Sequence, residues 1–263
     1  MHDALSQFKR NINQLFGICV EILNVGRSLQ QLSWSMQILA NNGVVQAAKV
    51  SGGKGRPMLA LVEILNHTPK EIRPEVETLE QLCAQLARVA AHSSSLVWRY
   101  HQLIATLLSS IRQGAEGRST SVDPAIDHLR FTTPEDLERL VHHTDFTHGD
   151  RLVQSNRAYL AHLCQTILGE LHTEFKHALR CLADTKRALN GLKMIGMTSR
   201  YMAFCIASEA AGLAEAEANF KNLSTEIGTL VDDLDGKTRT MKVAIDDGED
   251  LVELLLKGHA CAK

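Results

Sequence analysis

Residues Leu29–Ile64 read LQQLSWSMQILANNGVVQAAKVSGGKGRPMLALVEI, and residues Leu192–Ile227 read LKMIGMTSRYMAFCIASEAAGLAEAEANFKNLSTEI. A shift of 163 residues places the first stretch on the second, so that Ala40 meets Ala203. Few residues are identical, but apolar and small residues recur in both stretches at alternating steps of three and four. The two stretches therefore predict the same helical hairpin, present twice in one chain.

The periodic pattern continues outward from both stretches as an inner seam. In the first copy the seam consists of Leu5, Phe8, Ile12, Leu15, Cys19, Ile22, Gly26, Leu29, Ser33, Met36, Ala40, Gly43 and Ala47. In the second copy it consists of Cys164, Leu168, Leu171, Phe175, Ala178, Leu182, Thr185, Leu189, Leu192, Gly196, Ser199, Ala203, Ile206 and Ala210. A period of 3.5 sustained this long is typical of a coiled coil. Small residues at the C-terminal end of each seam predict close approach of helix backbones there.

The fold class predicted from these seams is all-α, an elongated antiparallel four-helix coiled-coil bundle made of two pseudo-symmetric helical hairpins. Residues 1–112 form the first hairpin, 113–150 a connecting segment with short helices, and 151–263 the second hairpin, together one bundle. The turns are expected at 51–57 and 212–217, and Pro69 and Pro74 are expected to interrupt the return helix of the first hairpin. The seam of the last helix is placed on Phe220, Leu223, Ile227, Leu230, Leu234, Met241, Leu251 and Leu255.

Composition limits the classes of partner. The chain has 263 residues, 5% of them aromatic, and a formal net charge of −2, which gives no bulk attraction to nucleic acid or to an anionic membrane. No apolar run reaches the roughly 18 residues of a membrane span, and the N-terminus has no signal-peptide pattern. The six cysteines form no CxxC pair and are interpreted as reduced core thiols, so a cytoplasmic location is expected.

Both turns carry residues of a known signalling family. The second copy has Glu209-Ala-Ala followed by Glu215, Phe220 and Glu226-Ile227, and the first keeps Asn42, Ala47-Ala48, Lys49 and Glu63. With this spacing, each quoted stretch resembles the hairpin tip of the cytoplasmic signalling domain of bacterial methyl-accepting chemotaxis receptors. Lys49 and Gly212 stand where that family has arginine.

The resemblance implies a signal-transduction and interaction module whose tip docks a coupling protein or a histidine kinase of a chemotaxis-type array. Asn42, Gln46 and Lys49, spaced four and three, share one helix face and are expected to contact one partner. The other candidate contact residues are Arg56 beside them, and Glu209 and Phe220 on the second hairpin. For Phe220, a core position that closes the seam is the favoured interpretation. Because both hairpins belong to one chain, the module need not form the family's dimer.

Two other functions stay open, a structural coiled-coil scaffold and a bundle that binds a metal or a ligand through histidines. The metal alternative rests on a cluster of His142, His143, Asp145, His148 and Asp150. Trp34 and Trp98 on the long helices are either packing residues or anchors of a partner surface. No catalytic or phosphate-binding motif is present, so the chain is predicted not to be an enzyme, and no cofactor is predicted.

Overall fold

The structure is a computed structural model that describes residues 2–50, 55–116, 151–213 and 216–257. Side-chain environments are described for residues 10–50, 55–110, 155–213 and 216–257. The predicted connecting segment falls almost wholly outside these ranges, as does the cluster between His142 and Asp150.

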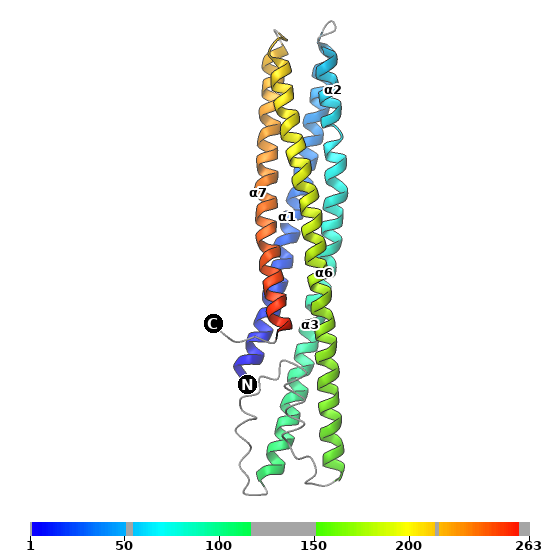
Figure 1. The fold of residues 1–263 in the computed structure, drawn as a ribbon, viewed down its shortest axis with the longest axis vertical. Coiled ribbons are helices and arrows are strands. Elements are labelled where there is room, and N and C mark those ends of the chain that lie inside the picture. Colours follow the sequence, from blue (N-terminus) through cyan, green and yellow to red (C-terminus); the bar gives the residue numbers. More distant parts are fainter. Residues whose placement is uncertain (1, 51–54, 117–150, 214–215, 258–263) are drawn as a thin grey trace. The chain divides into compact units, whose positions relative to one another are not determined.

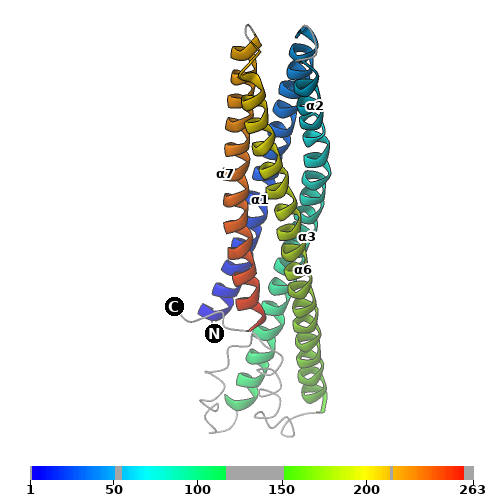
Figure 2. The ribbon, with the colours of Figure 1, turned by 45° about the horizontal axis from the view of Figure 1, so that its top comes forward.

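The described residues form five helices and no strand, which confirms the all-α fold class (Figure 1). The helices are α1 (His2–Lys49), α2 (Gly55–Leu65), α3 (Thr68–Glu116), α6 (Arg151–Ala210) and α7 (Glu217–Leu256). In Figures 1 and 2, α2 returns along the last part of α1, and the first part of α7 returns along the last part of α6. The two antiparallel hairpins predicted from the repeat are therefore present.

The chain divides into two compact units. Unit 1 comprises Met1–Gly17, Gln85–Cys181 and Gly248–Lys263, and unit 2 comprises Ile18–Ala84 and Leu182–Asp247. Each unit takes segments from both hairpins, so neither unit coincides with one hairpin. Unit 2 contains both hairpin turns and is built from parts of α1, α3, α6 and α7 together with all of α2.

Burial confirms the inner seam. Every seam position from Ile12 to Ala47 on α1, and from Cys164 to Ala210 on α6, is buried. Leu15, Cys19 and Ile22 are at most 1% exposed. The alternation of three and four brings these residues onto one side of each helix, where they form the core with α3 and α7.

On α7 one seam residue differs from the prediction. Leu230 is half-buried, whereas its neighbour Val231 is fully buried, so the seam steps from Ile227 to Val231 and then to Leu234. Periodicity alone cannot choose between two adjacent apolar residues. Here two steps of four, from Leu223 through Ile227 to Val231, are followed by a step of three to Leu234, so only the position at 230 differs from the prediction. Gly236 does not weaken the helix enough to end it, because α7 continues to Leu256.

The return helix of the first hairpin is interrupted once. Only Asn66 and His67 separate α2 from α3, and Glu71 N still donates to His67 O at 3.1 Å. Pro74, expected to break the helix, lies inside α3 instead. Its ring removes one backbone donor from Lys70 O, but Lys70 is exposed, so water can satisfy that carbonyl. Across the junction, Gln37 Nε2 on α1 donates to Asn66 Oδ1 at 2.5 Å.

Small seam residues bring backbones together near the turn of unit 2. A Cβ atom built on Gly43 would lie 2.7 Å from Val62 Cγ1 and 2.9 Å from Leu223 Cδ2. Both distances are shorter than side-chain carbons tolerate, so α1 approaches α2 and α7 closely only because residue 43 lacks a side chain. At Gly26, by contrast, a Cβ would meet nothing within 4 Å.

Candidate functional site

The ends of both hairpins lie on the same side of unit 2. Figures 1 and 2 both place the C-terminus of α1 and the C-terminus of α6 at one end of the bundle. The residues predicted as contact sites on the two hairpins therefore belong to one compact unit and one end of it.

On the first hairpin, the predicted contact residues are largely accessible. Asn42, Lys49 and Arg56 are exposed, whereas Gln46 is half-buried. The Oε1 atom of Gln46 is buried and accepts no hydrogen bond from the described part of the chain. Such an acceptor is stabilised by any donor that reaches it, since burying a carbonyl oxygen without a partner costs about 1–3 kcal/mol.

The second hairpin contributes less to this surface than predicted. Glu209 is exposed near the C-terminus of α6. Phe220 is 0% exposed and lies on the inner seam of α7, so its side chain belongs to the core and offers no surface to a partner. Of the two interpretations of Phe220, burial favours the core residue and corrects its assignment as a contact.

A second periodic pattern runs along the outside of α1 and α6, and the sequence analysis missed it. We define the α1 outer stripe as Gln31, Trp34, Ile38, Asn41 and Val45, and the α6 outer stripe as Met194, Met197, Tyr201, Phe204 and Ser208. All ten residues are exposed, and the shift of 163 that aligns the inner seams also aligns the two stripes. Their steps of three and four were the signal that could have revealed them.

The outer stripes contain the largest exposed apolar side chains of unit 2. Phe204 is 70% exposed and Tyr201 63%, while Trp34 on α1 is 66% exposed. The exposure of Trp34 and of Trp98 (64%) excludes the packing interpretation for both indoles. Contiguous apolar surface of this kind on a helix often marks a contact with another protein.

The tip half of α1 carries no charge. From Ser28 to Ala48 the sequence contains no Asp, Glu, Lys or Arg, and amides, hydroxyls and apolar side chains alternate around the helix. Asn42 lies four residues after Ile38 and three before Val45, and Gln46 lies four residues after Asn42, spacings that make side chains neighbours on a helix surface. The predicted polar residues and the apolar stripe therefore form one continuous face, which can be desolvated without removing a charge from water.

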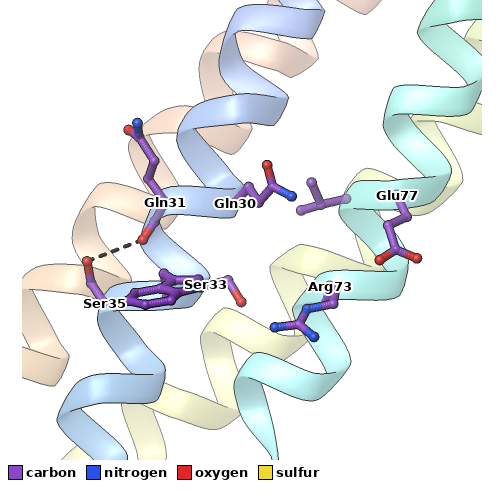
Figure 3. A pocket seen from close by; sticks show the side chains of 8 residues that line it. Gln30, Gln31, Ser33, Ser35, Arg73 and Glu77 are labelled. Carbon is purple, nitrogen blue, oxygen red and sulfur yellow. Dashed lines mark hydrogen bonds between the residues drawn. The ribbon is translucent and has the colours of Figure 1, made fainter.

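A groove of about 710 Å³ adjoins this face. It lies between α1 and α3 and is lined by Gln30, Gln31, Ser33, Trp34, Ser35, Arg73, Val76 and Glu77. In Figure 3 the side chains of Gln30 and Arg73 extend into the space between the two helices. Ser33 Oγ donates to Pro69 O at 3.3 Å, so the hydroxyl at the bottom of the groove is already bonded. The groove therefore adds amide and guanidinium donors beside Trp34.

Comparisons with protein families, with curated proteins and with solved structures find no match for this chain. Within the described ranges, no helix combines the length and apolarity that crossing a membrane requires. The same ranges contain no group of three or more His, Cys, Asp or Glu residues that could hold a metal ion. Of the histidines on α6, His162 and His177 are exposed and His172 is half-buried.

Proposed function

We propose that this chain is a chemoreceptor-like signalling and interaction module, and that the tip half of α1 docks a coupling protein or a receptor-linked histidine kinase. The observation that carries the proposal is the charge-free stretch of α1 from Ser28 to Ala48, on which Asn42 and Gln46 adjoin the exposed Ile38 and Val45, with Lys49 directly after it. No cofactor and no catalytic step is part of it. A cytoplasmic location belongs to the same proposal.

The chemistry of the face suits a helix-to-protein contact. Ile38 and Val45, 49% and 54% exposed, supply apolar area that contact removes from water. Asn42, whose side chain is exposed, supplies hydrogen bonds that fix the register. Lys49 at the end of the helix adds one charge at the rim. An apolar centre with a polar rim is the usual composition of a protein interface.

The test measures binding to a purified coupling protein and to the histidine kinase of a chemoreceptor array. The variant replaces Asn42, Gln46 and Lys49 with Ala together, and calorimetry compares its affinity with that of the parent chain. Because Asn42 and Lys49 are exposed and the change at Gln46 removes a buried oxygen without a partner, the variant should fold and be no less stable than the parent, while affinity should fall at least about tenfold, which corresponds to about 1.4 kcal/mol.

A matched control lies on the same helix. Arg10, Asn13 and Gln14 are exposed, have the same kinds of side chain, and lie within unit 1, away from the turn. Their replacement with Ala should leave affinity unchanged. If the tip variant binds as tightly as the parent, or if neither purified protein binds the parent, the docking proposal is refuted and the structural scaffold becomes the better interpretation.

A further inference from the structure

The α6 outer stripe is more continuously apolar than the α1 outer stripe. Four consecutive positions of the α6 stripe, Met194, Met197, Tyr201 and Phe204, are large and apolar, and they are 58–70% exposed. On α1 the equivalents of Met194 and Phe204 are the amides Gln31 and Asn41. Only α6 therefore carries an uninterrupted apolar stripe.

The spacing of the α6 stripe is that of a coiled-coil seam without a partner. Steps of three, four and three keep the four side chains on one side of α6 over about 15 Å of helix. The same helix uses a different side, from Leu192 through Gly196 and Ser199, for the core of unit 2. Another helix could therefore pack on the stripe without disturbing that core.

The exposed area is of the size that a symmetric dimer needs. At roughly 200 Å² for a large side chain, exposures of 58–70% leave about 500 Å² of these four residues open to solvent. Pairing of two copies through this stripe would cover about 1,000 Å², before the flanking residues are counted. Stable interfaces cover about 1,200–2,000 Å² in total, and flanking side chains such as Ser208 and the stem of Arg200 can supply the difference.

Charge also favours pairing of the stripe with itself. The only charged residue between Met194 and Ser208 is Arg200. Its guanidinium Nη2 lies 2.6 Å from Asp232 Oδ1 and 2.8 Å from Asp235 Oδ2, so its positive charge is paired with two carboxylates on α7, outside the stripe. Two copies of this face can meet without bringing like charges together, whereas a strongly charged partner would find no complement on it.

We propose that the α6 outer stripe binds the α6 outer stripe of a second copy of this chain, in an isologous dimer. In such a dimer a two-fold axis passes through the stripe, and each stripe residue appears twice in the contact. This contact is separate from the inner seam, which is buried within one chain. It is also independent of the proposed docking function, which uses α1.

The test is sedimentation velocity of the full chain over a wide concentration range. The parent should pass from monomer to dimer as concentration rises. Two double variants at the centre of the stripe, Met197→Glu/Tyr201→Glu and Met197→Lys/Tyr201→Lys, should each stay monomeric, with the dissociation constant raised at least about 100-fold. An equimolar mixture of the two should recover a dimer, because opposite charges then face each other in either helix orientation.

The control carries the same added charge elsewhere. Phe16 and Val243 are exposed apolar residues, 48% and 60%, and neither belongs to the stripe. Phe16→Glu/Val243→Glu should dimerise like the parent. Circular dichroism checks that the helices persist, and if the Glu variant unfolds, the neutral pair Met197→Gln/Tyr201→Gln takes its place. A parent that stays monomeric, stripe variants that dimerise like the parent, a control that loses the dimer equally, or a mixture without recovery would each overturn the proposal.

Discussion

Gly43 and Gly26 offer a matched test of close helix packing near the turn of unit 2. Both are buried glycines of α1 and both belong to the inner seam. A Cβ on Gly43 would lie 2.7 Å from Val62 Cγ1, whereas a Cβ on Gly26 would meet nothing within 4 Å. Replacement of either residue with Ala changes the backbone propensity equally, so the difference between the two variants isolates the packing effect.

The magnitudes follow from two opposing contributions to the free energy of unfolding. Ala in a helix interior is more favourable than Gly by about 1 kcal/mol, so Gly26→Ala should stabilise the protein by roughly that amount. An extra carbon in a filled site costs about 1–3 kcal/mol, because the Cγ1 atom of Val62 cannot move without the α2 backbone. Gly43→Ala should therefore be neutral to about 2 kcal/mol destabilising, and the two variants should differ by about 1–3 kcal/mol.

Urea unfolding monitored by circular dichroism measures the difference, and thermal melting should separate the variants by about 2–4 °C for each kcal/mol. A third variant identifies the cause. In Gly43→Ala/Val62→Ala the crowded methyl is removed, so the double variant should be more stable than the sum of the two single changes predicts. Equal stability of Gly43→Ala and Gly26→Ala would refute the close approach of α1 to α2 and α7.

Other predictions concern buried positions of the inner seam and an ion pair. Ala40→Glu and Ala203→Glu should each abolish the cooperative melting of unit 2, since Ala40 is 0% and Ala203 5% exposed and a buried unpaired carboxylate costs several kcal/mol; melting like that of the parent would show that these positions are not core. Burial raises the pKa of Cys164 from its ordinary value of 9.0 to about 12, so the folded protein holds this proton more tightly than the unfolded chain. The stability of the parent relative to Cys164→Ala should therefore be constant below pH 9 and fall by about 1.4 kcal/mol per pH unit from pH 9 towards pH 12, which urea unfolding at several pH values measures; a constant difference would contradict it. Arg200→Ala removes the exposed pairs with Asp232 and Asp235 and should cost less than about 1 kcal/mol; a larger loss in urea unfolding would mean that the pairs also hold α6 to α7.

The parts of the fold that follow a strict period could be predicted from the sequence. Burial of the α1 and α6 seams matches the residues chosen from alternating steps of three and four, because a 3.5-residue period leaves one side of a helix to face its neighbours. The misplaced residue on α7 occurs where two adjacent residues, Leu230 and Val231, are both apolar. There the choice depends on the local rotation of the helix, which neighbouring helices set.

Whether a proline interrupts the return helix near Pro69 and Pro74 depends on the access of water to the backbone, and not on residue type alone. Proline removes a backbone donor wherever it occurs, but the cost depends on whether water reaches the carbonyl left unpaired. At Lys70 the chain is exposed, so α3 continues through Pro74. The sequence gives the missing donor directly, whereas the access of water depends on the folded arrangement.

Part of the candidate site could be predicted from the position of residues relative to the inner seam. Asn42 and Lys49 are polar residues off the inner seam, and both are exposed. Phe220 could not be assigned in this way, because an aromatic residue beside a turn fits either a core or a contact surface. The outer stripes could not be predicted from single residues, because an isolated apolar residue outside the inner seam is common on a protein surface.

Because of the internal repeat, each residue of one outer stripe can be compared with its equivalent on the other hairpin. On the inner seam the positions described in both copies stay buried under the shift of 163 residues, although the side chains differ, as with Gly43 and Ile206. On the outer stripes burial imposes no restriction, and the equivalent positions differ in polarity, with Asn41 on α1 equivalent to Phe204 on α6. Exposed, helically spaced positions that differ in this way can form two separate contact surfaces. The polar face of α1 and the apolar stripe of α6 therefore fit different occupants, and substitutions in one stripe should leave the contact made by the other unchanged.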